Sequence, residues 1–410
     1  MDILPILSTL RRHKVTSWLL ILEIALTCAI VCNAVFLIGQ RLQRMNLPSG
    51  IAEHQLVQIQ LGYMGATSGA KAQTATDLAA LRQIPGVQQV AMTNQLPFAD
   101  SGSSNGGLKL TPDQQQDTLN VTEYYGENLL PALGLRLVAG RAFRPEEFVD
   151  LDSAVAALNK GEMKGLPQTL IITRSIADRL WPGQSALGKT IYFAKGFPFR
   201  VIGVVANLAR PNQLYNGVEY STLWPITVTS AERGSYLLRC APGDRDAVLK
   251  AALAKLKQLD PNRVVLQKRT YDEARRAFFA NDRAMTGMLV GVIIALLIVT
   301  ALGIVGLASF WVAQRRRTIG VRRALGATRA NILHYFQTEN FVLATIGIAL
   351  GMVLAYGINL FLMVHYELPR LPAIYFPVGA IALWLIGQLA VLGPALRAAA
   401  VPPVVATRSV

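Results

Sequence analysis

Four long apolar stretches dominate the hydrophobic pattern of the chain, at residues 15–40, 284–313, 340–364 and 371–396. A helix needs about twenty apolar residues to cross a bilayer, and each stretch is long enough. Between the first and second stretches lies a segment of ordinary soluble composition, residues 41–283. We therefore predict an α-helical membrane protein with four transmembrane helices and a large α+β domain between the first and second.

Both ends of the segment 41–283 alternate between strand and helix patterns. Residues 55–93 read as strand, helix and strand, and residues 235–268 repeat that order. Each β-α-β unit is too small to be stable alone, so we expect the two to pack as one layer near the membrane. The middle, about residues 100–215, is then an insertion, rich in strands and with a hairpin signal at residues 190–205.

Lysines and arginines concentrate at the ends of the apolar stretches. They lie in residues 1–14, 314–339 and 397–410, and are Arg11, Arg12, Lys14, Arg315, Arg316, Arg317, Arg322, Arg323, Arg329, Arg397 and Arg408. Short flanks of this kind stay in the cytoplasm, which places the large domain outside, in the periplasm. Most of the net charge of +15 therefore reflects topology. Without a basic stripe interleaved with aromatic residues in the large domain, nucleic-acid binding is disfavoured.

The chemistry-bearing residues argue against an enzyme. Residues 183–190 fit the phosphate-binding pattern G-x-x-x-x-G-K-[ST], but they follow a helix and precede a strand, the reverse of a true phosphate loop. The histidines (His13, His54, His334 and His365) lack metal-ligand spacing, and Cys240 stands alone in the outer segment. A cleaved signal peptide is the alternative for residues 1–40, but the apolar run is too long and a retained anchor is favoured. We expect no catalytic residues, no metal and no cofactor bound by this chain.

The segment between the second and third stretches carries the strongest signal. Placed on one helix, Val321, Leu325, Thr328, Ile332 and Phe336 share a face. Arg316 and Arg323 then lie opposite. Such an amphipathic helix has two interpretations: an anchor on anionic lipid headgroups, or a docking helix for a cytoplasmic partner, with the small residues Ala324, Gly326 and Ala327 allowing close approach.

This segment resembles that of MacB/FtsX-type permeases of ABC transporters, whose signature here is R-x-x-x-I-G-[IV]-R-[RK]-A-[LI]-G-A-[ST]. The fit runs through Arg315, Ile319, Gly320, Val321, Arg322, Arg323, Ala324, Leu325, Gly326, Ala327 and Thr328. Residues 124–143, 170–189, 201–205 and 394–408 are also similar to the family. The apparent phosphate loop falls where the family has a structural turn.

The resemblance implies a permease that does not itself hydrolyse nucleotide. In this family, movement of two cytoplasmic ATPase subunits passes through the inter-span helix to the outer domains, which move a periplasmic substrate. The ATPase-coupling residues would be Arg317, Ile319, Gly320, Arg322, Arg323, Ala324, Leu325, Gly326, Ala327 and Arg329. Residues 1–14 cannot supply hydrolysis, so we expect a separate ATPase chain that binds ATP and magnesium.

Further partners are implied: a second permease, as a homodimer or a paralogue heterodimer, and a periplasmic adaptor with an outer-membrane channel. The location would be the bacterial inner membrane. Alternatives to export are lipoprotein release, which would need an apolar groove at the base of the outer domain, and FtsX-like control of a cell-wall hydrolase, which usually goes with a smaller outer domain. A receptor or scaffold would bind no ATPase.

Two acidic residues fall in or beside the apolar stretches. A carboxylate in lipid costs several kcal/mol unless it is paired or protonated. For Glu23 we expect a neighbouring helix to face it, whereas interfacial solvation is favoured for Glu339. The glycines of the second stretch, Gly287, Gly291, Gly303 and Gly306, would allow close helix packing.

Overall fold

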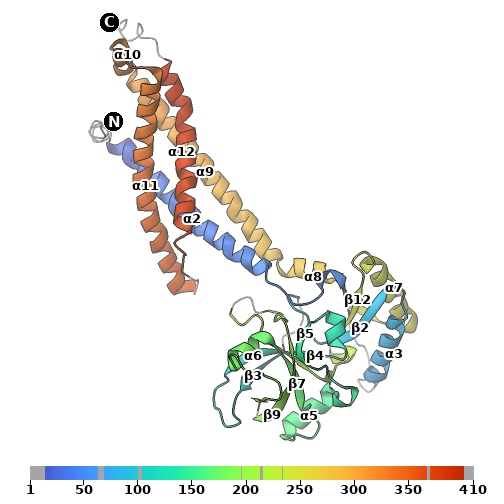
Figure 1. Ribbon diagram of the computed structural model, residues 1–410. Coiled ribbons are helices and arrows are strands. Elements are labelled where there is room, and N and C mark those ends of the chain that lie inside the picture. Colours follow the sequence, from blue (N-terminus) through green and yellow to red (C-terminus); the bar gives the residue numbers. More distant parts are fainter. Residues whose placement is uncertain are drawn as a thin grey trace. The chain divides into compact units, whose positions relative to one another are not determined.

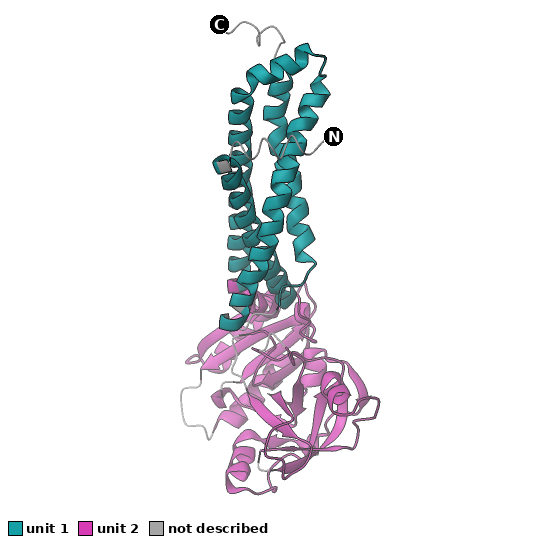
Figure 2. Cartoon of the chain, turned by 90° about the vertical axis from the view of Figure 1, so that its left-hand side faces the viewer, with its two compact units in different colours: residues 1–45, 282–410 teal, residues 46–281 magenta. Residues whose placement is uncertain are grey.

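The computed structural model describes residues 14–62, 69–99, 104–194, 196–212, 216–232, 234–366 and 370–400. The chain divides into two compact units, Met1–Met45 with Asp282–Val410, and Asn46–Asn281 (Figure 2). We refer to them as unit 1 and unit 2. Of the residues named above, Arg11, Arg12, His13 and Arg408 lie outside the described part of the chain.

Unit 1 is built from long helices. Those long and apolar enough to cross a membrane are α2 (Lys14–Met45), α9 (Ala280–Gln314), α11 (Arg329–Tyr366) and α12 (Tyr375–Ala399), and Figure 1 shows them beside the short α10 (Arg316–Ala324). The predicted fold class is confirmed: helices that can span a bilayer, with a large α+β domain between the first and second. The third helix differs in its start, since α11 begins at Arg329 and not near residue 340.

Helix α2 packs closely against α11 through two glycines of α11. A β-carbon on Gly347 would lie 2.9 Å from the Cβ of Ile24, and one on Gly351 would lie 2.5 Å from the Cβ of Cys28. The expectation for the glycines of α9 was largely wrong. Gly287, Gly291 and Gly306 have open space where a β-carbon would be, and only Gly303 of that set lies against a neighbour, Glu23.

Unit 2 contains a four-stranded antiparallel sheet made by both ends of its sequence. The first β-α-β segment supplies β1 (Leu56–Gly62), α3 (Ala70–Arg82) and β2 (Val87–Thr93), and the second supplies β12 (Ser235–Cys240), α7 (Arg245–Leu259) and β13 (Val264–Thr270). The strand order β13-β1-β12-β2 interleaves the two segments, as in a split β-α-β fold. Both helices cover one face and enclose a core that includes Leu81, Tyr236 and Leu256.

The chain between these segments forms a seven-stranded sheet of order β5-β9-β7-β10-β4-β3-β8. Its strands are β3 (Asn105–Lys109), β4 (Leu119–Tyr125), β5 (Leu137–Gly140), β7 (Thr169–Thr173), β8 (Thr190–Phe193), β9 (Phe197–Val205) and β10 (Ser221–Trp224). The insertion therefore extends to Trp224, beyond the expected end near residue 215. Strands β8 and β9 pair as an antiparallel hairpin.

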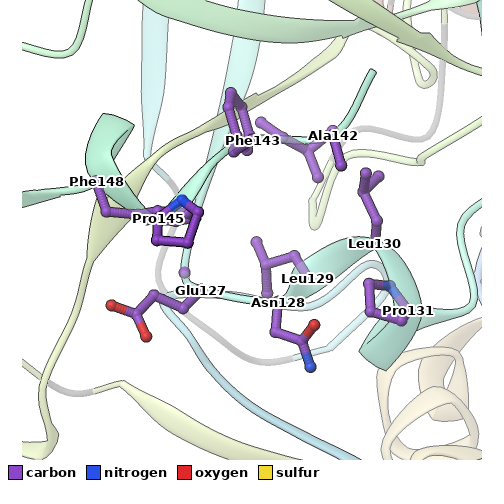
Figure 3. Close-up of a pocket in the computed structure, with 11 residues that line it drawn as sticks. Glu127, Asn128, Leu129, Leu130, Pro131, Ala142, Phe143, Pro145 and Phe148 are labelled. Carbon is purple, nitrogen blue, oxygen red and sulfur yellow. The ribbon is translucent and has the colours of Figure 1, made fainter. Parts of the chain in front are cut away.

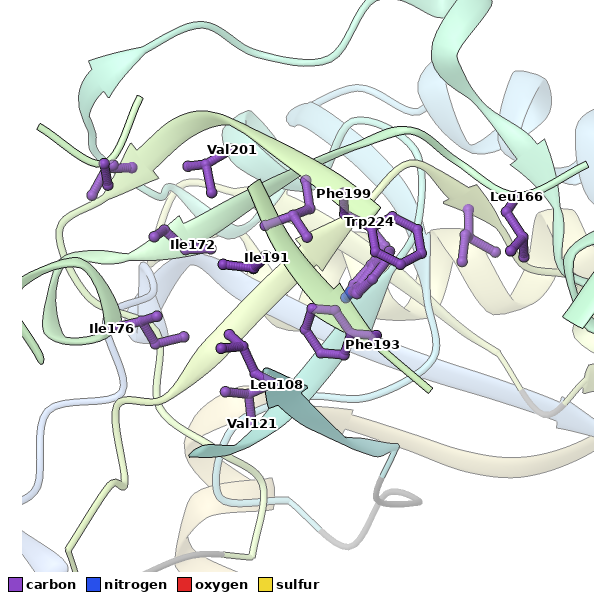
Figure 4. Close-up of a cluster of buried hydrophobic side chains, with 14 of the residues drawn as sticks. Leu108, Val121, Leu166, Ile172, Ile176, Ile191, Phe193, Phe199, Val201 and Trp224 are labelled. Atoms are coloured by element: carbon purple, nitrogen blue, oxygen red, sulfur yellow. The ribbon is translucent and has the colours of Figure 1, made fainter. Parts of the chain in front are cut away.

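Shorter elements complete unit 2. They are η1 (Glu53–Gln55), α4 (Leu129–Leu133), η3 (Pro145–Glu147), β6 (Val149–Asp150), α5 (Leu151–Lys160), α6 (Arg174–Leu180), β11 (Ile226–Thr227), η4 (Ser230–Glu232) and α8 (Tyr271–Phe278). One face of the seven-stranded sheet carries a buried cluster in which Phe193, Phe199 and Trp224 meet edge to face (Figure 4). Helix α5 contributes Ala154 and Ala157 to the same cluster.

Candidate functional site

Helix α10 is a separate element with a defined end. Its last turn closes as a Schellman motif: Gly326 N donates to Arg323 O at 3.2 Å and Ala327 N donates to Arg322 O at 3.0 Å. Gly326 has φ +99°, a conformation that a residue with a β-carbon adopts only with strain. Thr328 Oγ1 then accepts a hydrogen bond from Asn331 N at 3.2 Å, as an N-cap of α11.

This break corrects the predicted amphipathic face. The sequence pattern placed Val321, Leu325, Ile332 and Phe336 together, but Val321 and Leu325 are 47% and 83% exposed, whereas Ile332 and Phe336 are buried. The periodicity of 3.6 residues holds only along one uninterrupted helix, and the turn at Gly326 resets it. The predicted face is therefore divided between an exposed side of α10 and a buried side of α11.

The buried side of α10 holds the helix against the ends of the long helices. Ile319 is buried in a cluster with Val312, Ile332, Phe336 and the alanines of the last turn of α12 (Ala395, Ala398 and Ala399). Arg323 Nη1 donates to Ala399 O at 3.0 Å, which satisfies a carbonyl at the C-terminal end of α12. Gly320 is also buried. Helix α10 therefore contacts α9, α11 and α12.

An ion pair reinforces the junction between α9 and α11. Arg315 Nη1 lies 3.1 Å from Glu339 Oε1 and 3.0 Å from Glu339 Oε2, and the Glu339 side chain is only 2% exposed. The Arg315 guanidinium also lies 5.9 Å from the centre of the Trp311 ring, within cation–π distance. Interfacial solvation of Glu339 was therefore the wrong expectation, since this carboxylate is buried and paired.

The opposite side of α10 is exposed and carries both apolar and basic groups. We call it the docking face and define it as Arg317, Val321, Arg322, Ala324 and Leu325, all exposed. Arg322 lies over the ring of Tyr335, at 5.1 Å from its centre. Leu325 is 83% exposed and Val321 is 47% exposed, so the docking face presents two large apolar side chains beside its arginines.

The structure thus divides the residues predicted for coupling into two groups. Arg317, Arg322, Ala324, Leu325, Gly326 and Arg329 are exposed, whereas Ile319 and Gly320 are buried and Arg323 and Ala327 are half-buried. The first group is available to a partner, and the second attaches the helix to unit 1. Trp311, Tyr335, Glu339 and the Ala399 carbonyl complete this arrangement. Sequence reasoning did not assign their contacts.

Glu23 faces another helix. A β-carbon on Gly303 of α9 would lie 2.5 Å from Glu23 Oε2, so the carboxylate rests on the surface that this glycine leaves open. One turn further along α2, Thr27 and Thr300 share a hydrogen bond of 2.8 Å between their hydroxyl groups. Within the described part of the chain, no hydrogen bond or ion pair reaches the Glu23 carboxylate.

The apparent phosphate loop is a turn between a helix and a strand. It leads from the end of α6 to the start of β8, and Lys189 Nζ donates to Gln184 Oε1 at 2.5 Å and lies 5.3 Å from the centre of the Trp181 ring. Its lysine is held within the turn. Among the described residues no group of His, Cys, Asp and Glu could hold a metal ion, and Cys240 is buried in β12 as a free thiol.

Unit 2 also contains cavities that open to its surface. One, of about 320 Å³, is lined by Leu129, Leu130 and Phe143, with Glu127 and Asn128 at its edge (Figure 3). A second, of about 290 Å³, lies beside the aromatic cluster of the seven-stranded sheet and is lined by Glu123, Val155 and Trp224 among others. Both are near the lower limit of size for small-molecule sites.

Comparison with known protein families assigns both parts of the chain. Residues 17–256 match the model of the MacB-like periplasmic core domain, and residues 290–403 match that of the FtsX-like permease C-terminal domain. The first match alone covers more than half of the chain. The periplasmic-core match contains the seven-stranded sheet and, except for β13, the four-stranded sheet of unit 2. The permease match contains α10 and its docking face.

Individual relatives are distant, and each match covers only part of the relative. The chain is 26% identical to the uncharacterized ABC transporter permease YvrN of Bacillus subtilis, over 61% of this chain and 64% of the relative. It is 24% identical to the macrolide export ATP-binding/permease protein MacB of Neisseria gonorrhoeae, over 66% and 40% respectively. The chain thus spans about half the length of these curated relatives.

A solved structure gives a weaker match. The periplasmic region of MacB from Actinobacillus actinomycetemcomitans is 17% identical, with a TM-score of 0.34, and the match covers 56% of this chain and 94% of that one. The family models carry the assignment, and they agree with the arginine-rich signature and with helices that can span a membrane around an α+β domain. The chain belongs to the MacB/FtsX-type family of ABC transporter permeases.

Proposed function

We propose that the chain is the permease subunit of a transporter that carries ATP-driven movement across the bacterial inner membrane to the periplasmic unit 2. A cytoplasmic ATPase dimer, which binds ATP and magnesium, would dock on α10. A second permease would complete the membrane part, and a periplasmic adaptor with an outer-membrane channel would take the exported substrate. This chain supplies no catalytic residue in that scheme.

The observation that carries the proposal is the two-sided character of α10. Its docking face is exposed, with Leu325 at 83%, while Ile319 on the other side is 5% exposed and packs on α9, α11 and α12. A partner that pushes on the exposed side therefore acts on a helix already attached to three spanning helices. Packed interiors are close to incompressible, so such a displacement is passed on rather than absorbed locally.

Polar contacts also tie α10 and the ends of the long helices together. The Arg315–Glu339 pair joins the end of α9 to α11, and the Arg323 hydrogen bond joins α10 to the end of α12. A buried ion pair loses several kcal/mol if its partners separate, whereas a small joint movement of both helices leaves it intact. Movement at α10 should therefore shift the helices together.

The test is retention of the ATPase by purified full-length permease. Leu325→Glu places a charge at the most exposed apolar position of the docking face without removing a buried contact. Leu110→Glu is the matched control, because Leu110 is another exposed leucine, at 38%, on unit 2. The native chain and the Leu110→Glu variant should co-purify with an ABC ATPase, recognised by its nucleotide-binding motif, and Leu325→Glu should lose at least nine-tenths of it.

The competing interpretation of α10, an anchor on lipid headgroups, gives the opposite result. An anchor weakened by one glutamate would still leave any ATPase bound elsewhere on the permease. Retention of the ATPase at the native level by a Leu325→Glu variant of unchanged thermal stability would therefore rule out docking through this face.

A further inference from the structure

The second cavity of unit 2 combines apolar walls with one acidic group. Its walls come from the aromatic cluster (Phe193, Phe199 and Trp224) and from α5, which supplies Leu151, Ala154, Val155 and Leu158. Figure 4 shows the three rings gathered on one side of the sheet, with Leu166 beyond them. Each ring is only 4% exposed, so these walls are fixed by packing, whereas Val155 at the rim is 47% exposed.

Glu123 is the acidic group of this cavity. It lies on β4 on the same face as Val121, and Val121 is part of the buried hydrophobic cluster that also contains the three aromatic rings. Its Oε2 accepts hydrogen bonds from Tyr125 Oη and, at 3.4 Å, from Ser104 Oγ. Its Oε1 accepts none from the described residues, and no lysine or arginine among them forms an ion pair with it.

The backbone beside Glu123 leaves room for this free oxygen. Gly106 of β3 lines the cavity, and a β-carbon there would clash with Glu123 Oε1. Burial raises the pKa of the Glu123 carboxyl, and the hydrogen bonds from Tyr125 and Ser104 offset that effect only in part. A carboxylate in such a place is stabilised by a cation that donates a hydrogen bond to it.

We propose that this cavity binds a small organic ammonium ion with an apolar body. The ammonium group would donate to Glu123 Oε1, and the body would lie against the rings of Phe193, Phe199 and Trp224. Aromatic faces attract a cation as well as an apolar group, so both parts of the ligand find matching surroundings. The volume of about 290 Å³ limits the ligand to a small molecule.

This inference goes beyond the proposed function, because binding in unit 2 requires no ATPase. The probes are 4-phenylbutylamine, the neutral 4-phenyl-1-butanol and the anionic 4-phenylbutyrate, which share one apolar skeleton. Calorimetric titration uses the full chain in nanodiscs of zwitterionic lipid, with empty nanodiscs as the blank. The native chain should bind the amine at least tenfold more tightly than the alcohol, and the acid more weakly still.

Two variants locate the site. Glu123→Gln keeps the shape of the side chain and an acceptor for Tyr125 but removes the charge, so the amine should bind it no more tightly than the alcohol. Glu127→Gln is the matched control at the edge of the other cavity and should behave as the native chain. The Leu325→Glu variant should also bind the amine normally, which separates this proposal from ATPase docking.

Several results would overturn the proposal. Equal affinity of the native chain for amine and alcohol would show that no acidic group takes part, and this comparison does not depend on any variant folding. Unchanged amine binding by a folded Glu123→Gln variant would place the ligand elsewhere. Absence of amine binding up to millimolar concentration would show that the cavity is not a site for this class.

Discussion

Glu147 is a single residue on which two segments of unit 2 converge. Its carboxylate accepts hydrogen bonds from Arg141 Nη1 and Nη2 at 2.7 and 2.9 Å, from Arg144 N at 2.7 Å and from Thr169 Oγ1 at 3.1 Å. These donors, Arg141 first, lower the pKa of Glu147 from 4.5 to about 2. The residue therefore connects the segment after β5 to the start of β7.

A pH dependence of stability follows from this pKa. The pKa of Glu147 is about 2 in the folded chain and about 4.5 in the unfolded chain. The ionised carboxylate therefore stabilises the folded state fully above about pH 4.5. This stabilisation is lost as the pH falls to about 2. We expect Glu147→Gln to lower the melting temperature at pH 6, and its difference from the native chain to shrink steadily below pH 4.5.

The measurement is thermal unfolding of the full chain across that pH range. Glu162→Gln serves as the control, because Glu162 is exposed and its side chain has no partner among the described residues. This control should follow the native curve throughout. A difference between native chain and Glu147→Gln that stays constant from pH 6 to pH 2.5 would show that the ion pair adds nothing that titrates.

At the scale of whole elements, α2 and α11 depend on backbone approach at Gly351. A β-carbon there would lie 2.5 Å from Cys28 Cβ and 2.6 Å from the Ala25 carbonyl oxygen, both rigid parts of α2. We expect Gly351→Ala to force the two helices apart and to destabilise unit 1 by about 1–3 kcal/mol, the usual cost of overpacking. Thermal unfolding in detergent measures this loss.

Gly357 provides the matched control on the same helix. A β-carbon on Gly357 would have no neighbour within 4 Å, so Gly357→Ala should leave the melting temperature unchanged or raise it slightly, since alanine favours the helix. Equal effects of the two substitutions would mean that the contact between α2 and α11 does not limit stability.

Local patterns predicted the elements better than their contacts. Long apolar runs indicated the membrane helices, and alternation indicated β1 and β12, because both signals are read from neighbouring residues. The interleaved order β13-β1-β12-β2 joins strands from opposite ends of unit 2, and no local signal encodes that pairing. The extension of the insertion to Trp224 was missed for the same reason.

At the candidate site, too, the sequence predicted the element but not its contacts. The signature located α10 and its residues, but the pattern treated residues 321–336 as one helix, and Gly326 with φ +99° divides them. The Arg315–Glu339 pair joins α9 to α11, and the Arg323 bond to Ala399 joins residues far apart in the chain. Such pairs depend on how the helices are rotated against each other, which only the packed structure determines.

At the scale of the whole molecule, the proposed function requires α10 and unit 2 to lie on opposite sides of the membrane. The positive-inside rule predicts that the arginine-rich α10 lies in the cytoplasm. The native cysteines, Cys28, Cys32 and Cys240, are at most 1% exposed, so the chain offers a low background for thiol labelling. Arg317 on the docking face and Leu110 on unit 2 are exposed positions for new cysteines.

A charged maleimide that does not cross membranes then tests the orientation. In spheroplasts, Leu110→Cys should be labelled and Arg317→Cys should not, because only the periplasmic surface is reachable. Inside-out vesicles should reverse this pattern, and the native chain should stay unlabelled in both. Labelling of both positions from the same side would place α10 and unit 2 in one compartment. A cytoplasmic ATPase could not then act on α10 and drive a domain across the bilayer, whatever the affinity of the docking face.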